Sequence, residues 1–90
     1  MHTAEIEGEL IQWHLGRERL KHYVAEVLPL ARDRSRAAVA SYSAGRGDLR
    51  GAVEALTQEI DTQVAYVQLE GQVARAWTYL HFLHDSGASP

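Results

Sequence analysis

SYSAGRGDL, residues 41–49, is the stretch in the middle of the chain where a helical pattern stops and restarts. Gly45 suits the position just after a helix, where a left-handed residue lets the last carbonyl groups find partners. Asp48 suits the N-cap of a second helix, because its carboxylate can accept hydrogen bonds from the free amides ahead of it. A connection this short makes its two helices lie side by side and antiparallel. The sequence therefore predicts an all-α helical hairpin with its tip at residues 45–48.

The first helix is expected over residues 4–44. Its apolar residues recur in steps of three and four, a spacing close to that of helices that pack in a coiled-coil manner. This seam comprises Ile6, Leu10, Trp13, Leu20, Val24, Val27, Ala31, Ala38 and Tyr42. Pro29 interrupts the run, since it lacks an amide and clashes with the carbonyl of Ala25, so a kink is predicted near residues 26–28.

The second helix is expected over residues 49–84, with residues 85–90 as a solvated tail after a stop at Ser86 and Gly87. Its predicted seam comprises Leu49, Val53, Leu56, Ile60, Val64, Val67, Gly71, Ala74, Trp77, Leu80 and Leu83. A flanking stripe comprises Tyr66, Leu69 and Val73. Folding the helices back on the tip brings equally distant residues level, so Arg32, Arg34 and Arg36 are predicted near Glu59 and Asp61.

Composition limits what such a chain can do. Ninety residues make one small domain, and a lone hairpin buries only one stripe per helix, so we expect self-association into a four-helix bundle or membership of a larger protein. A net charge of −3 argues against nucleic acid as a partner, and the lack of cysteine excludes disulfides and thiol chemistry. No apolar run reaches the ~18 residues of a membrane span, and no signal peptide is recognisable, so a soluble segment without membrane contact is expected.

Several motifs in order resemble the TolC family of outer-membrane efflux ducts, most closely its heavy-metal and cation-efflux branch. They are VLPLA (27–31), ASYSAG (40–45), Leu49 with VEA (53–55), and ARAW (74–77) with Leu80 and Leu83. The resemblance covers roughly residues 5–84 and matches only the family's C-terminal periplasmic helical hairpin. Many members carry a polar or acidic residue where this chain has Gly51. The chain is therefore expected to be either an excised piece of such a duct or a free-standing hairpin.

The resemblance implies a periplasmic location and a trimeric duct, with the hairpin as a strut of its wall. It also implies that the tip docks a periplasmic adaptor protein and moves as the duct opens. The residues that match this tip are Tyr42, Gly45, Arg46, Gly47, Asp48 and Leu49. If the chain is not a member of this family, the two glycines have only the structural role of making the turn. The isolated chain is then expected to dimerise as a small interaction module.

Other candidate sites have simpler interpretations. His81 and His84 can share a helix face, with His14 opposite, but helix-end histidines are usually solvated, so no metal site or cofactor is predicted. Trp13, Trp77, Tyr79 and Phe82 are expected to pack at the open end of the hairpin. No spacing of serines, histidines or paired carboxylates indicates catalysis, so the chain is predicted not to be an enzyme.

Overall fold

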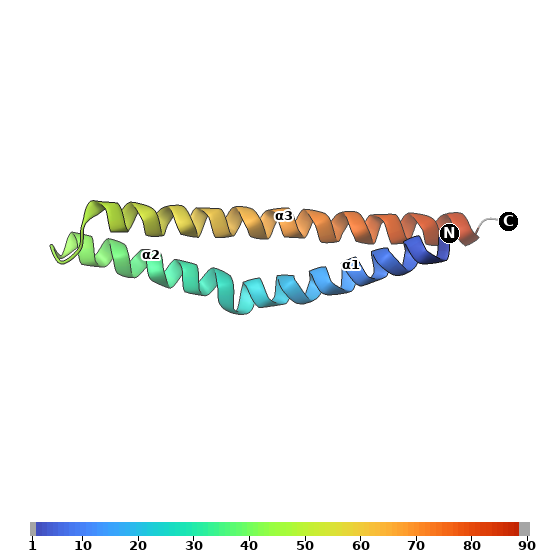
Figure 1. Ribbon diagram of the computed structural model, residues 1–90, viewed down its shortest axis with the longest axis horizontal. Coiled ribbons are helices and arrows are strands. Elements are labelled where there is room, and N and C mark those ends of the chain that lie inside the picture. The colour runs from blue at the N-terminus through green and yellow to red at the C-terminus, as the bar shows by residue number, and fades with distance from the viewer. Residues whose placement is uncertain (1, 89–90) are drawn as a thin grey trace.

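The chain folds into one long hairpin of antiparallel helices, seen in a computed structural model that describes residues 2–88, with side chains over residues 3–83. The first arm consists of α1 (His2–His22), a π-helical segment η1 (Tyr23–Val27) and α2 (Leu28–Ser43). The second arm is α3 (Leu49–Ala88). The two arms lie side by side, with the ends of the chain opposite the turn (Figure 1), in a rod of 70 × 18 × 16 Å. Residues 2–88 contain no strand, so the all-α hairpin is confirmed.

The helix boundaries differ from those expected at two places. The first arm begins at His2, and α3 continues past the expected end near residue 84 to Ala88. Ser86 and Gly87 are therefore helical rather than a stop. A single glycine costs a helix only about 1 kcal/mol, which lowers its stability without forcing it to end.

The first arm changes its helical geometry in the middle. Residues Tyr23–Val27 form the π-helical segment, and Pro29 follows in the first turn of α2. Because proline has no amide, the carbonyl of Ala25 receives no bond from it, and a wider local turn accommodates that loss. Figure 1 shows the first arm farthest from α3 around this segment.

The contact between the arms is built mainly from small residues. The buried residues are Gly16, Ser35, Ala52, Leu69 and Ala76. At Gly16 an added Cβ would overlap the Cγ2 methyl of Val73, so the two backbones approach closely there. No large side chain in the described part is fully buried, so the hairpin has a seam rather than a thick core.

The predicted seam of the second helix is largely wrong. Its leading residues are 42–62% exposed: Leu49, Val53, Leu56, Ile60, Val64, Val67 and Trp77, hereafter the α3 stripe. Leu56 and Trp77 lie at the edge of the contact, where they line grooves between the arms. A contact between two helices covers only one narrow stripe of each. On α3 that place is taken by Ala52, Ala76 and the predicted flanking residue Leu69, so the broader apolar stripe stays uncovered.

Ion pairs contribute little to holding the arms together. In the part of the chain that is described, the ion pairs join neighbours on the first arm or on α3: Lys21–Glu18, His22–Glu26 and Arg50–Glu54. Such exposed pairs contribute at most ~1 kcal/mol each. Arg32 and Arg36 share a groove with Glu59, as the predicted register requires, whereas Arg34 lies in a different groove.

Candidate functional site

The backbone amides of the turn between the arms are hydrogen-bonded within the chain. The amides of Ala44, Gly45, Arg46 and Gly47 donate to carbonyl groups in the last turn of α2, at distances of 2.8–3.1 Å. These four amides are therefore already bonded within the chain and are not free for a partner. The bonds cap the helix end and make the turn a stiff, internally satisfied structure.

The glycines of the turn have separate structural reasons. Gly45 has φ = +75°, the left-handed conformation predicted for the residue after the helix. Gly47 packs on α2, where an added Cβ would lie 3.1 Å from the Cβ of Ser41. At Gly51 an added Cβ would lie 2.9 Å from Oδ1 of Asp48. Gly45 and Gly47 therefore favour glycine because of the turn itself, whereas at Gly51 the atom that an added Cβ would meet is the end of the Asp48 side chain.

Asp48 begins the second arm in the predicted manner. Its Oδ1 accepts a hydrogen bond of 2.8 Å from the amide of Gly51, and its backbone carbonyl accepts one of 3.3 Å from Ala52. These bonds satisfy an amide at the helix start and place a negative charge at the positive end of the helix dipole. The carboxylate of Asp48 is thus largely committed to capping.

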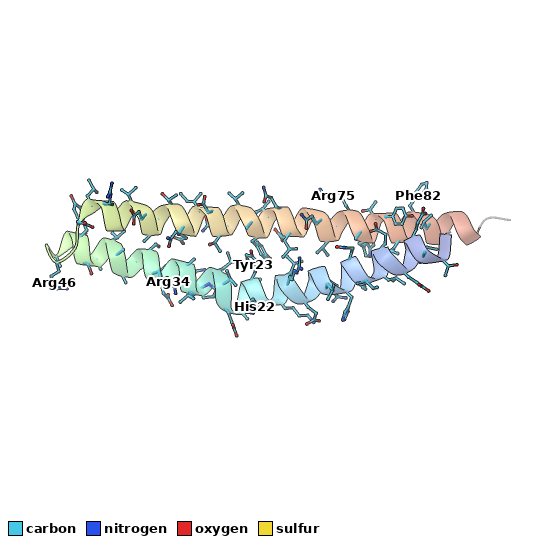
Figure 2. The ribbon with its side chains drawn as sticks, viewed as in Figure 1. His22, Tyr23, Arg34, Arg46, Arg75 and Phe82 are labelled. Carbon is cyan, nitrogen blue, oxygen red and sulfur yellow. The ribbon has the colours of Figure 1, made fainter. Side chains whose placement is uncertain are left out.

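The side chains are what the turn offers to a partner. Tyr42 and Leu49 are 45% and 57% exposed, and Arg46 is exposed at the turn end of the rod (Figure 2). The predicted tip residues are therefore brought together at one end of the molecule. They combine an aromatic ring, an aliphatic side chain and a guanidinium group, which can bind a partner by apolar contact and by hydrogen bonds to carbonyl or carboxylate oxygens.

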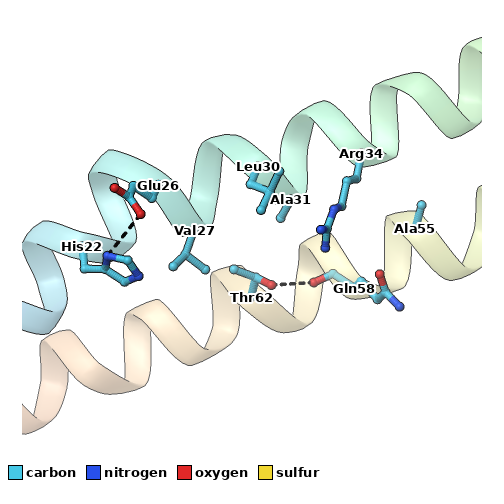
Figure 3. A pocket seen from close by; sticks show the side chains of 9 residues that line it. All are labelled: His22, Glu26, Val27, Leu30, Ala31, Arg34, Ala55, Gln58 and Thr62. Carbon is cyan, nitrogen blue, oxygen red and sulfur yellow. Dashed lines mark hydrogen bonds and ion pairs between the residues drawn. The ribbon is translucent and has the colours of Figure 1, made fainter.

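A groove beside the π-helical segment was not anticipated from the sequence. It is lined by nine residues of both arms, among them His22, Glu26 and Arg34 from the first arm (Figure 3). Nδ1 of His22 lies 3.5 Å from Oε2 of Glu26, and the two side chains are 61% and 72% exposed. The hydroxyl of Thr62 donates to the carbonyl of Gln58, so it is already used within α3. This groove is open and solvated, and it lacks the enclosed geometry of an active site.

Two tyrosines have shifted titrations. Burial, the charge of Glu70 and a hydrogen bond to that carboxylate all raise the pKa of Tyr66 above its usual value. Burial, the charges of Glu5 and Glu9, and a hydrogen bond to Glu5 raise the pKa of Tyr79. Tyr66 also meets Tyr23 across the hairpin, with ring centroids 6.0 Å apart. These tyrosines thus tie α3 to the first arm rather than form a reactive centre.

Only part of the aromatic packing predicted at the open end is present, because Phe82 is 68% exposed and Tyr79 lines a different groove from Trp13 and Trp77. Trp13 and Trp77 line one groove, Arg17 lies 4.9 Å over the Trp13 ring, and Trp77 stacks on His81 at 5.0 Å. In the described part of the chain, no three histidine, aspartate or glutamate side chains are grouped to hold a metal ion. The side chain of His84 lies outside the described residues, so the pairing suggested for it with His81 is not addressed.

Comparison with protein-family models, with curated proteins and with solved structures finds no match for this chain. Over the described residues, none of the helices combines the length and apolar character needed to cross a membrane.

Proposed function

We propose that this chain is the periplasmic helical hairpin of a TolC-type outer-membrane efflux duct, of the branch that exports heavy-metal and other cations. It would form a strut of the wall of a trimeric duct, with its turn docked on a periplasmic adaptor protein. The support is the ordered motif resemblance together with a 70 Å rod that presents its turn at one end. Such a hairpin binds and transmits movement, and it carries out no chemistry of its own.

Three finer features belong to the same proposal. The first arm bends at Pro29, the helices pack in a coiled-coil manner against neighbouring hairpins, and the isolated chain self-associates. The uncovered α3 stripe supports the last two, because contiguous apolar surface of this kind marks an interaction site.

The observation that carries the docking role is the stiff turn with its three exposed side chains, Tyr42, Arg46 and Leu49. Because the amides of residues 44–47 are already bonded within the turn, a partner gains affinity from these side chains. A preorganised turn also loses little entropy when it is bound.

The test is binding of the chain to the isolated helical hairpin of a periplasmic adaptor from a cation-efflux system, measured by biolayer interferometry. Arg46→Glu should weaken binding at least about tenfold, because it removes the guanidinium and adds an opposing charge. Arg34→Glu is the matched control, since Arg34 is exposed on the side of the first arm, away from the turn. No binding by the parent chain, or equal binding by both variants, would contradict the docking role.

A second candidate is a free-standing helical module that dimerises and acts as an interaction or regulatory element. The α3 stripe favours it independently of any family, since it needs only another helical surface to cover it. Adaptor binding distinguishes the two, because the free-standing module has no reason to recognise an adaptor hairpin.

A further inference from the structure

The two sides of the hairpin differ in polarity. One side carries the α3 stripe and two grooves between the arms, the first lined by Arg32, Val39 and Leu56 and the second by Trp13, Leu20 and Trp77. The grooves of the opposite side combine the apolar side chains of Leu15 and Leu30 with a larger number of polar residues. These include Gln12, Arg19, Arg34, Gln58, Thr62, Gln72 and Arg75. The apolar side, hereafter the stripe side, is therefore the one that loses most by staying in water.

The first arm contributes apolar surface to the same side. Leu10 and Val24 are 47% and 56% exposed and continue the spacing of Trp13 and Leu20 along α1 and into η1. Val39, 37% exposed, extends the surface along α2 towards the turn. The stripe side thus offers apolar residues from both arms along most of the rod.

Its area is large enough for a stable dimer. A rod 70 Å long and 16–18 Å wide presents roughly 1,000 Å² on one side, compared with about 800 Å² per partner in a typical stable interface. The hairpin's own seam buries no large side chain fully in the described part. The apolar surface left uncovered therefore matches what association of two copies requires.

Charge on the stripe side is divided between the arms. Arg17 and Arg32 lie on the first arm, and Lys21 continues their side one helical turn after Arg17. Glu70 of α3 lines the same groove as Arg17. It is level with the stretch that contains Arg17 and Lys21, because Tyr66 meets Tyr23 and Val73 meets Gly16. One arm is thus basic on this side, and the other carries an acid at a matching height.

This division selects one of the two symmetric ways to stack two hairpins. A two-fold axis parallel to the rod places α3 of each copy on the first arm of the other and keeps all heights, so Glu70 meets the partner's basic residues. A two-fold axis across the rod places the two first arms against each other. Arg17, Lys21 and Arg32 of one copy then face the same basic residues of the other copy, and like charges repel. We infer that a second copy of this chain covers the stripe side, with the two turns at the same end. The inference rests on the self-association proposed above and adds the surface and the orientation.

The surface is tested with two isoleucines of nearly equal exposure. Ile60 of the stripe is 57% exposed, and Ile11, on the outer face of α1, is 58% exposed. Sedimentation equilibrium should find the parent chain dimeric, and Ile60→Glu should raise its dissociation constant at least about tenfold, because two carboxylates would replace apolar side chains in the interface and lose their hydration. Ile11→Glu should leave the dimer intact, and circular dichroism should find both variants as helical as the parent.

The orientation is tested by energy transfer between labelled copies. The chain has no cysteine, so Ser43→Cys at the exposed end of α2 takes a single label. With turns at the same end, and helices packed about 10 Å apart, donor and acceptor lie within roughly 20 Å. With turns at opposite ends they lie nearly the full 70 Å length apart, and transfer is almost lost.

Each result bears on the inference. A monomeric parent, an Ile60→Glu variant that dimerises like the parent, or an Ile11→Glu variant that dissociates equally would overturn the surface. Weak transfer in an intact dimer would overturn the orientation. Failure of the docking role can be distinguished from failure of this inference, because Arg46→Glu should change adaptor binding and leave the dimer unaffected.

Discussion

Gly16 is the position where the structure makes its sharpest prediction about the packing of the arms. Substitution by alanine in a helix ordinarily stabilises it by about 0.5–1 kcal/mol, because glycine loses more backbone freedom on folding. At Gly16, however, the new methyl would overlap Cγ2 of Val73, and such overpacking costs about 1–3 kcal/mol. Gly16→Ala should therefore be neutral to destabilising by about 2 kcal/mol.

Gly8 supplies the matched control, since it lies in the same helix and an added Cβ there meets nothing within 4 Å. Gly8→Ala should be stabilising, so the two variants should differ by roughly 1–3 kcal/mol in free energy of unfolding. For a domain of this size, each 1 kcal/mol moves the midpoint of thermal unfolding by about 4–8 °C. The melts are followed by circular dichroism at one fixed chain concentration, because the proposed self-association would make the midpoint depend on concentration.

A double-mutant cycle identifies the cause of any loss. Val73→Ala removes the methyl group that the new Cβ would meet, so in that background Gly16→Ala should recover most of its helix-propensity gain. A Gly16→Ala variant as stable as Gly8→Ala would refute the reasoning, because it would mean that the arms do not approach each other at this level. A loss that persists with Val73→Ala would refute it as well, by placing the cost elsewhere.

Three further substitutions test the turn, the seam and the tyrosines. Asp48→Ala should cost about 0.5–2 kcal/mol in urea unfolding, with Asp48→Asn close to the parent, because only the oxygen that caps α3 is required. Ser35→Ala should cost about 1–3 kcal/mol by the same measurement, since the buried Ser35 hydroxyl donates a hydrogen bond of 2.6 Å to the charged Oε1 of Glu59 and so links the two arms. Tyr66 has a raised pKa in the folded chain, so its protonated hydroxyl contributes to the free energy of unfolding. That contribution is fully present below about pH 10, the ordinary tyrosine pKa, and is lost as the pH rises further. Melts across this range should decline less steeply for Tyr66→Phe, and an unchanged decline would assign the effect to other groups.

The turn could be predicted from sequence because its determinants are local. Gly45 and Asp48 act on the backbone within a few residues, and both adopt the expected roles. The register of the arms follows from the turn, since residues equally far from it come level, as Trp13 and Trp77 do in lining one groove. Neither inference needs knowledge of what surrounds the hairpin.

The seam could not be predicted in the same way. Periodicity shows that a helix has an apolar stripe but not which neighbour covers it. In α3 the most regular stripe lies at Ile60 and its neighbours in steps of three and four, while contact with the first arm falls on Ala52, Leu69 and Ala76. Small residues carry a weak hydrophobic signal, yet they allow the closest approach of two backbones. The periodicity of α3 therefore indicates the exposed side of the helix rather than the side that contacts the first arm.

Both proposals for function involve the difference between the side of α3 that contacts the first arm and the exposed α3 stripe. The seam of small residues holds the arms close but removes little apolar area from water, so it contributes modestly to stability. The α3 stripe carries the larger side chains, whose burial would contribute more than the seam does. The contact with the first arm includes Leu69, Tyr66 and Val73 beside the small residues, yet most of the large apolar side chains of the stripe remain exposed. Under either proposal, with another hairpin of a duct wall or a second copy of this chain as the neighbour, covering Ile60 and the residues around it would stabilise the rod.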